Sequence, residues 1–99
     1  MRAIHEISLD KVKDRVKEEG FECFKYIRVN GQYRFCVLYN SHPDLLDEGE
    51  VAESAGFVRI NRSDVKISDH SMLLKLWPCD ADYEELPKLF DKPLHKEEW

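Results

Sequence analysis

The chain has 99 residues, of which 42% are hydrophobic, and its formal net charge is −5. This length fits one domain with a modest core. An acidic surface repels phosphate backbones, so nucleic acid is not the expected partner. No apolar run is long enough to cross a bilayer, and the first ten residues lack the apolar region of a signal peptide. With three widely spaced cysteines, these features predict a cytoplasmic protein that does not contact a membrane.

The segment "SLDKVKDRVKEEG" predicts a helix that begins after Ser8 and ends at Gly20. The Ser8 hydroxyl can accept a hydrogen bond from an early backbone N–H, and Gly20 can take the left-handed conformation that ends helices. The narrow apolar stripe of this helix consists of Leu9, Val12 and Val16.

Asn30-Gly31 lies between two apolar-aromatic runs and predicts a β-hairpin with a two-residue type I′ loop. This loop fixes the register, since Val29 then faces Gln32. One predicted face is aromatic and meets the core, and it includes Tyr39. The cross-strand pairs expected on the two faces are Phe24–Val37, Tyr26–Phe35 and Arg28–Tyr33 on one, and Cys23–Leu38, Lys25–Cys36 and Ile27–Arg34 on the other.

The middle of the chain leaves two alternatives open. "EVAESAG" is either a helix that ends at Gly56 or the start of a strand at Val51. The helix alternative gives an αββ-αββ pseudo-repeat. At Gly20 and again at Gly56, the glycine is followed by a phenylalanine and then by a strand-like run.

In the last third, "SDHSMLLKLW" predicts a central strand covered on both faces. "CDADYEELPKLF" predicts a helix, with Asp80 or Asp82 near its start and an interruption or kink at Pro87. The prediction is a single α+β domain over residues 1–90 with a largely antiparallel sheet, an N-terminal helix, a hairpin and a C-terminal helix. Residues 91–99 are expected to form a frayed polar tail.

His42 is the leading catalytic candidate. It follows a strand and precedes Pro43, and loops at strand ends often carry catalytic groups. A neutral imidazole at this position suits a general base, a nucleophile or a metal ligand, although most loop histidines serve none of these roles.

Two further candidates depend on charge. In the predicted register Lys25 neighbours Cys36, and an ammonium beside a thiol favours a reactive thiolate. The basic cluster Arg59, Arg62 and Lys66 can hold a phosphate or an acidic partner, or can be a solvated hairpin.

No motif points to a cofactor or a metal. Cys23, Cys36, His42, His70 and Cys79 lack the close ligand pairs that zinc sites use. No phosphate-binding glycine loop, GxSxG or HExxH pattern occurs, so no cofactor and no metal are expected.

Short fragments resemble, in order, the janus and phosphohistidine phosphatase family. They are "FKY", "YR…YNSHPD", "RI" and "HSM". Together they cover about a fifth of the chain. The family's glycine triplet is replaced around Ser54 to Val58, its glycine before the loop serine is replaced by Asp69-His70, and the spacings are shorter.

The resemblance implies a metal-independent phosphatase. It would transfer a phosphoryl group from a phosphohistidine to His42, with Lys25 at the site and with Arg59 and the loop serine Ser71 binding the phosphate.

The expected function is a binding or regulatory module that acts through protein contacts, with the phosphatase as the alternative. A two-sided sheet in a short chain needs more cover than two or three short helices provide, and a homodimer would supply it. A partner strand added at the exposed hairpin edge is the other expected mode of contact.

Overall fold

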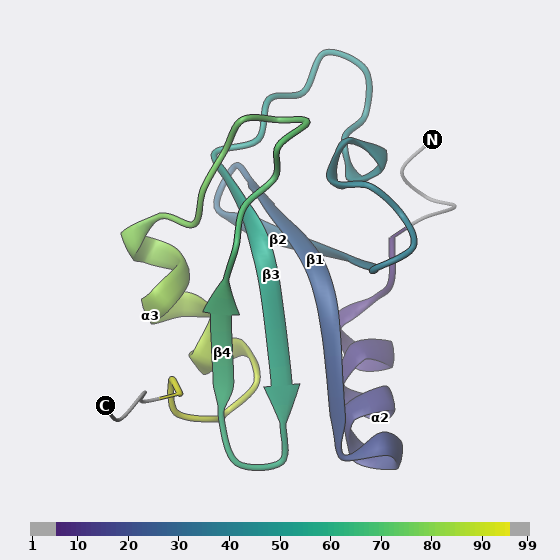
Figure 1. Cartoon of the computed structure of the whole chain (residues 1–99), viewed down its shortest axis with the longest axis vertical. Helices are drawn as coiled ribbons and strands as arrows, with labels where there is room; N and C mark the ends of the chain where they lie inside the picture. Colours follow the sequence, from purple (N-terminus) through teal and green to yellow (C-terminus); the bar gives the residue numbers. More distant parts are fainter. Residues whose placement is uncertain (1–5, 96–99) are drawn as a thin grey trace.

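The computed structural model describes residues 6–95, which form one four-stranded antiparallel sheet with helices packed on it. The strand order is β2-β1-β3-β4 (Figure 1). The α+β class is therefore confirmed. The elements in chain order are α2 (Leu9–Glu19), β1 (Phe21–Val29), β2 (Gln32–Val37), the 3-10 helix η1 (His42–Leu45), β3 (Ser54–Asn61), β4 (Val65–Ser68) and α3 (Asp80–Leu89).

Helix α2 begins and ends where local sequence signals place its ends. The Ser8 hydroxyl accepts from the backbone N–H of Lys11 at 3.3 Å. Gly20 has a φ of 79° and donates its N–H to the Val16 carbonyl, a left-handed ending that a glycine adopts at low cost. The first helix is thus confirmed at both ends.

Strands β1 and β2 are joined by Asn30 and Gly31, which both have positive φ, as a type I′ loop requires. The observed pairs run from Phe24–Val37 to Val29–Gln32. The second strand stops at Val37, and Tyr39 is 96% exposed. The expectation that Tyr39 belongs to the core face was therefore wrong, because the chain turns away before reaching it.

Both helices pack on one face of the sheet. The main core joins Val12 and Val16 of α2 and Leu86 of α3 to strand residues that include Phe24 and Val58. The opposite face carries a smaller cluster, in which η1 and the loops after it cover only the upper part of the sheet (Figure 1). The members of this second cluster are Ile27, Val29, Cys36, Leu45, Ala52 and Ala55, with Leu46, Leu74 and Leu76 packed against it.

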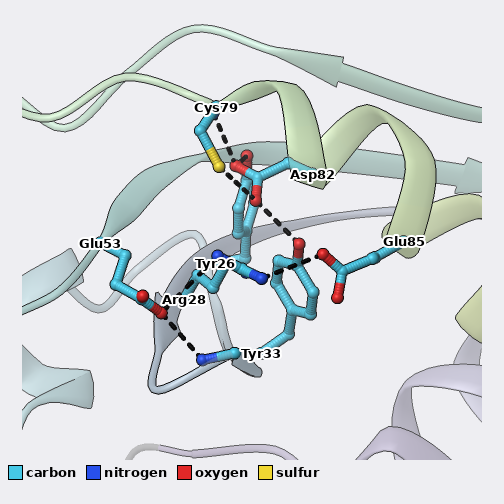
Figure 2. A network of polar contacts seen from close by, with 8 residues as sticks. Tyr26, Arg28, Tyr33, Glu53, Cys79, Asp82 and Glu85 are labelled. Carbon is cyan, nitrogen blue, oxygen red and sulfur yellow. Dashed lines mark hydrogen bonds and ion pairs between the residues drawn. The ribbon is translucent and has the colours of Figure 1, made fainter.

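A buried polar network fastens α3 to the sheet (Figure 2). The carboxylate of Asp82, which has no exposed surface, accepts hydrogen bonds from the hydroxyls of Tyr26 at 2.7 Å and Tyr33 at 2.8 Å. It also accepts from the backbone N–H of Cys79 at 3.0 Å. Burial alone would raise the pKa of Asp82, but these bonds hold it below its ordinary value. Asp82 is therefore a structural anchor as well as a residue of the first helical turn.

The middle segment contains neither predicted alternative in full. Strand β3 begins at Ser54 rather than Val51, and Gly56 lies inside it. A Cβ at Gly56 would approach Pro78 to 2.9 Å, so this glycine permits close packing and does not end a helix. Between β2 and β3 the described chain contains only the four-residue η1, so the long helix that a second αββ unit needs before β3 is missing there.

The predicted central strand in "SDHSMLLKLW" was wrong. Residues 71–76 form a turn closed by one bridge between Ser71 and Leu76, and Lys75 has a positive φ of 54°. Met72 is 79% exposed, so it is not a covered strand residue. The apolar alternation arises because Leu74 and Leu76 pack on the second cluster.

Helix α3 continues through Pro87 to Leu89, so proline does not interrupt it. Its N-cap is Cys79. After it the chain returns to the sheet, where Val65 donates to the Pro93 carbonyl and accepts from the N–H of His95. Residues 93–95 are thus held against β4, and the rest of the expected tail, 96–99, lies outside the described residues.

Candidate functional site

The lower part of the sheet face opposite the two helices is open, and we call it the open face. The strand register places Cys23 opposite Arg59 and Lys25 opposite Phe57 on this face. All of its side chains are exposed or partly exposed. The open face consists of Phe21, Cys23 and Lys25 from β1, Phe57 and Arg59 from β3, and Lys66 from β4.

Cations and aromatic rings alternate on the open face. The Lys25 Nζ lies 5.8 Å from the centre of the Phe57 ring, and the Arg59 guanidinium carbon lies 5.5 Å from that of Phe21. Such contacts are worth about 0.5–1 kcal/mol at exposed sites. The rings therefore hold the cationic groups in place without neutralising their charge.

No carboxylate occupies a strand position on this side of the sheet. Arg59 lies directly opposite Lys66, a like-charge pair that by itself destabilises a sheet. In a chain of net charge −5 the open face is thus a local concentration of positive charge.

His42 lies at the upper border of the open face. Its Nε2 is 2.8 Å from the Gly56 carbonyl oxygen, and its ring meets Phe57 edge-on at 5.4 Å. A carbonyl only accepts hydrogen bonds, so Nε2 carries the proton and Nδ1 is unprotonated in the neutral ring. Burial lowers the pKa of His42, and the charge of Lys25 lowers it further. The imidazole is therefore neutral near pH 7, and it ties η1 to β3.

The histidine is also largely enclosed. Only 5% of its surface is exposed, although it follows a strand and precedes a proline. A nucleophile needs access to its substrate, so a reaction at Nδ1 would require η1 to move.

Cys36 is fully buried and lies directly opposite Lys25 on the neighbouring strand. Burial raises the pKa of its thiol to about 11, although the charge of Lys25 acts in the opposite direction. The expectation of a reactive thiolate at Cys36 is corrected on this ground, because desolvation outweighs the nearby ammonium. Burial likewise raises the pKa of Cys23, with Arg59 opposing it.

The residues suggested by the phosphatase resemblance gather only in part. His42 and Lys25 both contact Phe57. The Arg59 guanidinium lies over Phe21, toward the start of β1. Ser71 is 1% exposed, and its hydroxyl accepts from the Leu74 N–H at 3.2 Å. The serine therefore stabilises its own turn, and its hydroxyl faces away from solvent.

The predicted basic cluster is divided between the two faces. Arg59 and Lys66 belong to the open face, whereas Arg62 turns toward the helices and donates to the Lys17 carbonyl at 3.4 Å.

Within residues 6–95, no group of three or more His, Cys, Asp or Glu side chains is placed to hold a metal ion. The cysteines and histidines considered as ligands are accordingly not gathered there. The same range contains no helix of the length and hydrophobicity needed to cross a bilayer.

Sequence reasoning did not identify Phe21 and Phe57 as part of a site. A signal was present, since aromatic and basic residues alternate in "FECFK" and in "FVR". The joint face became visible only when the β1–β3 register placed Lys25 opposite Phe57.

Comparisons of the chain with protein-family models, curated proteins and solved structures found no match.

Proposed function

We propose that this protein is a binding module whose open face takes an acidic segment of a partner protein. The observation that carries the proposal is the pair of cationic groups Lys25 and Arg59, each set over an aromatic ring on a face without strand carboxylates, in an acidic chain. Charge-assisted hydrogen bonds from these groups suit carboxylates, and the half-open Phe21 and Phe57 rings suit apolar side chains between them.

An acidic peptide fits this surface better than a nucleic acid does. Electrostatic interactions are screened over about 8 Å at physiological salt, so a short segment responds mainly to the local cations. A nucleic acid continues past the open face, where its phosphates meet the surface of a chain with a net charge of −5.

The test measures fluorescence anisotropy of a labelled peptide of alternating glutamate and phenylalanine, with variants Lys25→Glu and Arg59→Glu. We expect each reversal to weaken binding at least tenfold and higher salt to weaken it for the parent chain. Lys11→Glu is the matched control, because Lys11 is exposed on α2, on the opposite side of the sheet. Its affinity should stay within twofold.

Three outcomes would contradict the proposal. They are no binding at 50 mM salt, equal binding by Lys25→Glu and the parent, and tighter binding of a labelled ten-nucleotide RNA than of the peptide. Sedimentation in the absence of peptide tests the remaining expectation, a homodimer. A dimer that Lys25→Glu dissociates would assign the open face to a second copy of the chain.

The phosphatase is the second candidate, and the observation that favours it is the 2.8 Å contact between His42 Nε2 and the Gly56 carbonyl oxygen, which leaves Nδ1 without a proton in the neutral ring, with Lys25 nearby. The reaction would move a phosphoryl group from a phosphohistidine nitrogen to Nδ1 of His42 and then to water. Turnover of an aryl phosphate should be lost in both His42→Ala and His42→Gln. Glutamine can keep the hydrogen bond to Gly56 but has no nucleophilic nitrogen, so turnover retained by His42→Gln would exclude this mechanism.

A further inference from the structure

On the helical side of the molecule, a groove opens between α2 and the chain after α3. Its cavity volume is about 380 Å³, at the lower end of the range for small-molecule sites. We call it the α2–α3 groove. Its lining consists of Lys13, Val16 and Lys17 from α2, Ile60 from β3, Arg62 from the following turn, and Phe90, Asp91 and Lys92 after α3.

The floor of the α2–α3 groove is apolar and firmly packed. Val16, Ile60 and Phe90 belong to the main core and are at most 5% exposed. An apolar group laid on this floor would remove further hydrocarbon surface from water, which is worth about 25 cal/mol per Å².

The rim is cationic. It carries Lys13, Lys17, Arg62 and Lys92 against a single carboxylate, Asp91. Within the described part of the chain, Arg62 and Lys92 bond to backbone carbonyls rather than to carboxylates. The last turns of α2 and α3 add roughly half a negative charge each, so the rim still keeps a net positive charge.

Arg62 is held in place by its neighbours. Its guanidinium packs beneath Gly20, where an added Cβ would approach the guanidinium carbon to 3.3 Å, and it donates to the Lys17 carbonyl. Lys92 in turn donates to the Arg62 carbonyl at 3.3 Å. The groove thus combines an apolar floor with cations from three separate segments of the chain.

We infer that the α2–α3 groove binds a small amphiphilic anion, with a hydrocarbon portion on the floor and a carboxylate or phosphate head among the rim cations. This site is separate from the open face, which lies on the other side of the sheet, and it does not depend on the function proposed there. The carboxylate and the phosphate share the chemistry that the rim recognises, so both are tested.

Decanoate and decyl phosphate, each below its critical micelle concentration, are titrated into the ¹⁵N-labelled full chain and followed by amide chemical shifts. Shifts are expected at Val16, Ile60 and Phe90 for both ligands. In the series from hexanoate to decanoate, affinity should rise roughly fourfold per methylene until the floor is filled. Decanol and decyltrimethylammonium, which lack the anionic head, should bind at least tenfold more weakly.

The variant pair is Lys13→Glu and Lys11→Glu. These positions lie two residues apart on α2, and each residue of a helix turns about 100°, so the two side chains point about 200° from each other. Only Lys13 lines the groove. Lys13→Glu should weaken decanoate binding about tenfold, while Lys11→Glu leaves it unchanged. An unchanged amide spectrum outside the groove checks that each variant is folded.

The inference is overturned if neither decanoate nor decyl phosphate shifts the lining residues, if decanol binds as tightly as the anion that binds, or if both variants lose affinity equally. Binding of only one of the two anions supports the site and identifies its head group.

Discussion

The hydroxyl of Tyr26 on β1 lies 2.7 Å from Oδ2 of Asp82 on α3, fully enclosed between the sheet and the helix. The residues are 56 positions apart in the chain, so this hydrogen bond joins elements formed in its two halves. Its stability depends on the carboxylate remaining ionised.

Tyr26→Phe is expected to destabilise the fold by about 1–3 kcal/mol, because it leaves the buried Asp82 carboxylate with one fewer donor. The measurement is urea unfolding at pH 7. Tyr83→Phe is the matched control, since Tyr83 lies next to Asp82 on α3 and is 42% exposed. If Tyr26→Phe lowers the free energy of unfolding no more than Tyr83→Phe does, the hydrogen bond from Tyr26 adds nothing to stability.

The same network predicts acid sensitivity. The pKa of Asp82 is lowered by folding from its ordinary value of 3.8, so its contribution is present above that pH. The contribution is lost as the pH falls from 3.8 through the lower folded value. Asp82→Asn should therefore be less stable than the parent chain at pH 7, and the difference should shrink toward pH 2.5. A difference that stays constant with pH would contradict this assignment.

His42 predicts a second pH dependence in a different range. Folding lowers its pKa from 6.5, so the folded chain binds fewer protons than the unfolded chain below that pH. Stability should fall as the pH drops below 6.5, with a slope of at most about 1.4 kcal/mol per pH unit.

His42→Gln isolates this effect, because the amide can still donate to Gly56 while it does not titrate. Between pH 7 and pH 5, the variant should lose less stability than the parent in urea unfolding. His95→Gln provides the comparison, since His95 lies 2.7 Å from Asp64 and, unlike His42, is partly exposed. If His42→Gln retains the full pH slope, the imidazole is not its source.

The thiol of Cys36 should be the slowest of the three to react. Its pKa of about 11, against an ordinary 9.0, reduces the thiolate fraction near neutral pH about a hundredfold. Reaction with Ellman's reagent at pH 7.5 should show a slow phase that is absent in Cys36→Ser and becomes fast in denaturant. A slow phase that persists in Cys36→Ser would assign it to Cys23 or Cys79 instead.

Gly56→Ala should cost about 1–3 kcal/mol, because the new methyl group overlaps Pro78 at 2.9 Å and approaches Tyr26 to 3.2 Å. The double variant Gly56→Ala/Pro78→Ala removes the closest of these contacts. Its loss of stability should be smaller than the sum of the two single losses, which thermal unfolding measures. Strict additivity would mean that Pro78 is not the obstacle.

Local signals predicted the parts of the fold that local interactions decide. Ser8 and Gly20 mark the ends of α2 because each bonds within one helical turn, and Asn30-Gly31 occupies the loop between β1 and β2. The turn at residues 71–76 contains no glycine or proline, and its positive φ at Lys75 has no sequence signal, so alternation alone suggested a strand.

The candidate site was less predictable, since it depends on long-range pairing. The sequence drew attention to Lys25 and Arg59, but their common surface follows from the pairing of β1 with β3. Arg62 is three positions from Arg59, yet Arg62 lies on the other side of the sheet. His42 and Cys36 are likewise buried because η1 packs on the sheet, and no short motif predicts where on the sheet η1 lies.

The two edge strands of the sheet, β2 and β4, are each already bridged to a short segment from elsewhere in the chain. Ile7 donates its N–H to the Phe35 carbonyl on β2, and Leu94 is bridged to Val65 on β4. A partner that extends the sheet at either of these positions would first have to displace an intramolecular competitor tethered to the same chain. The tether keeps that competitor at high effective concentration, so a partner strand would need a correspondingly higher affinity to replace it.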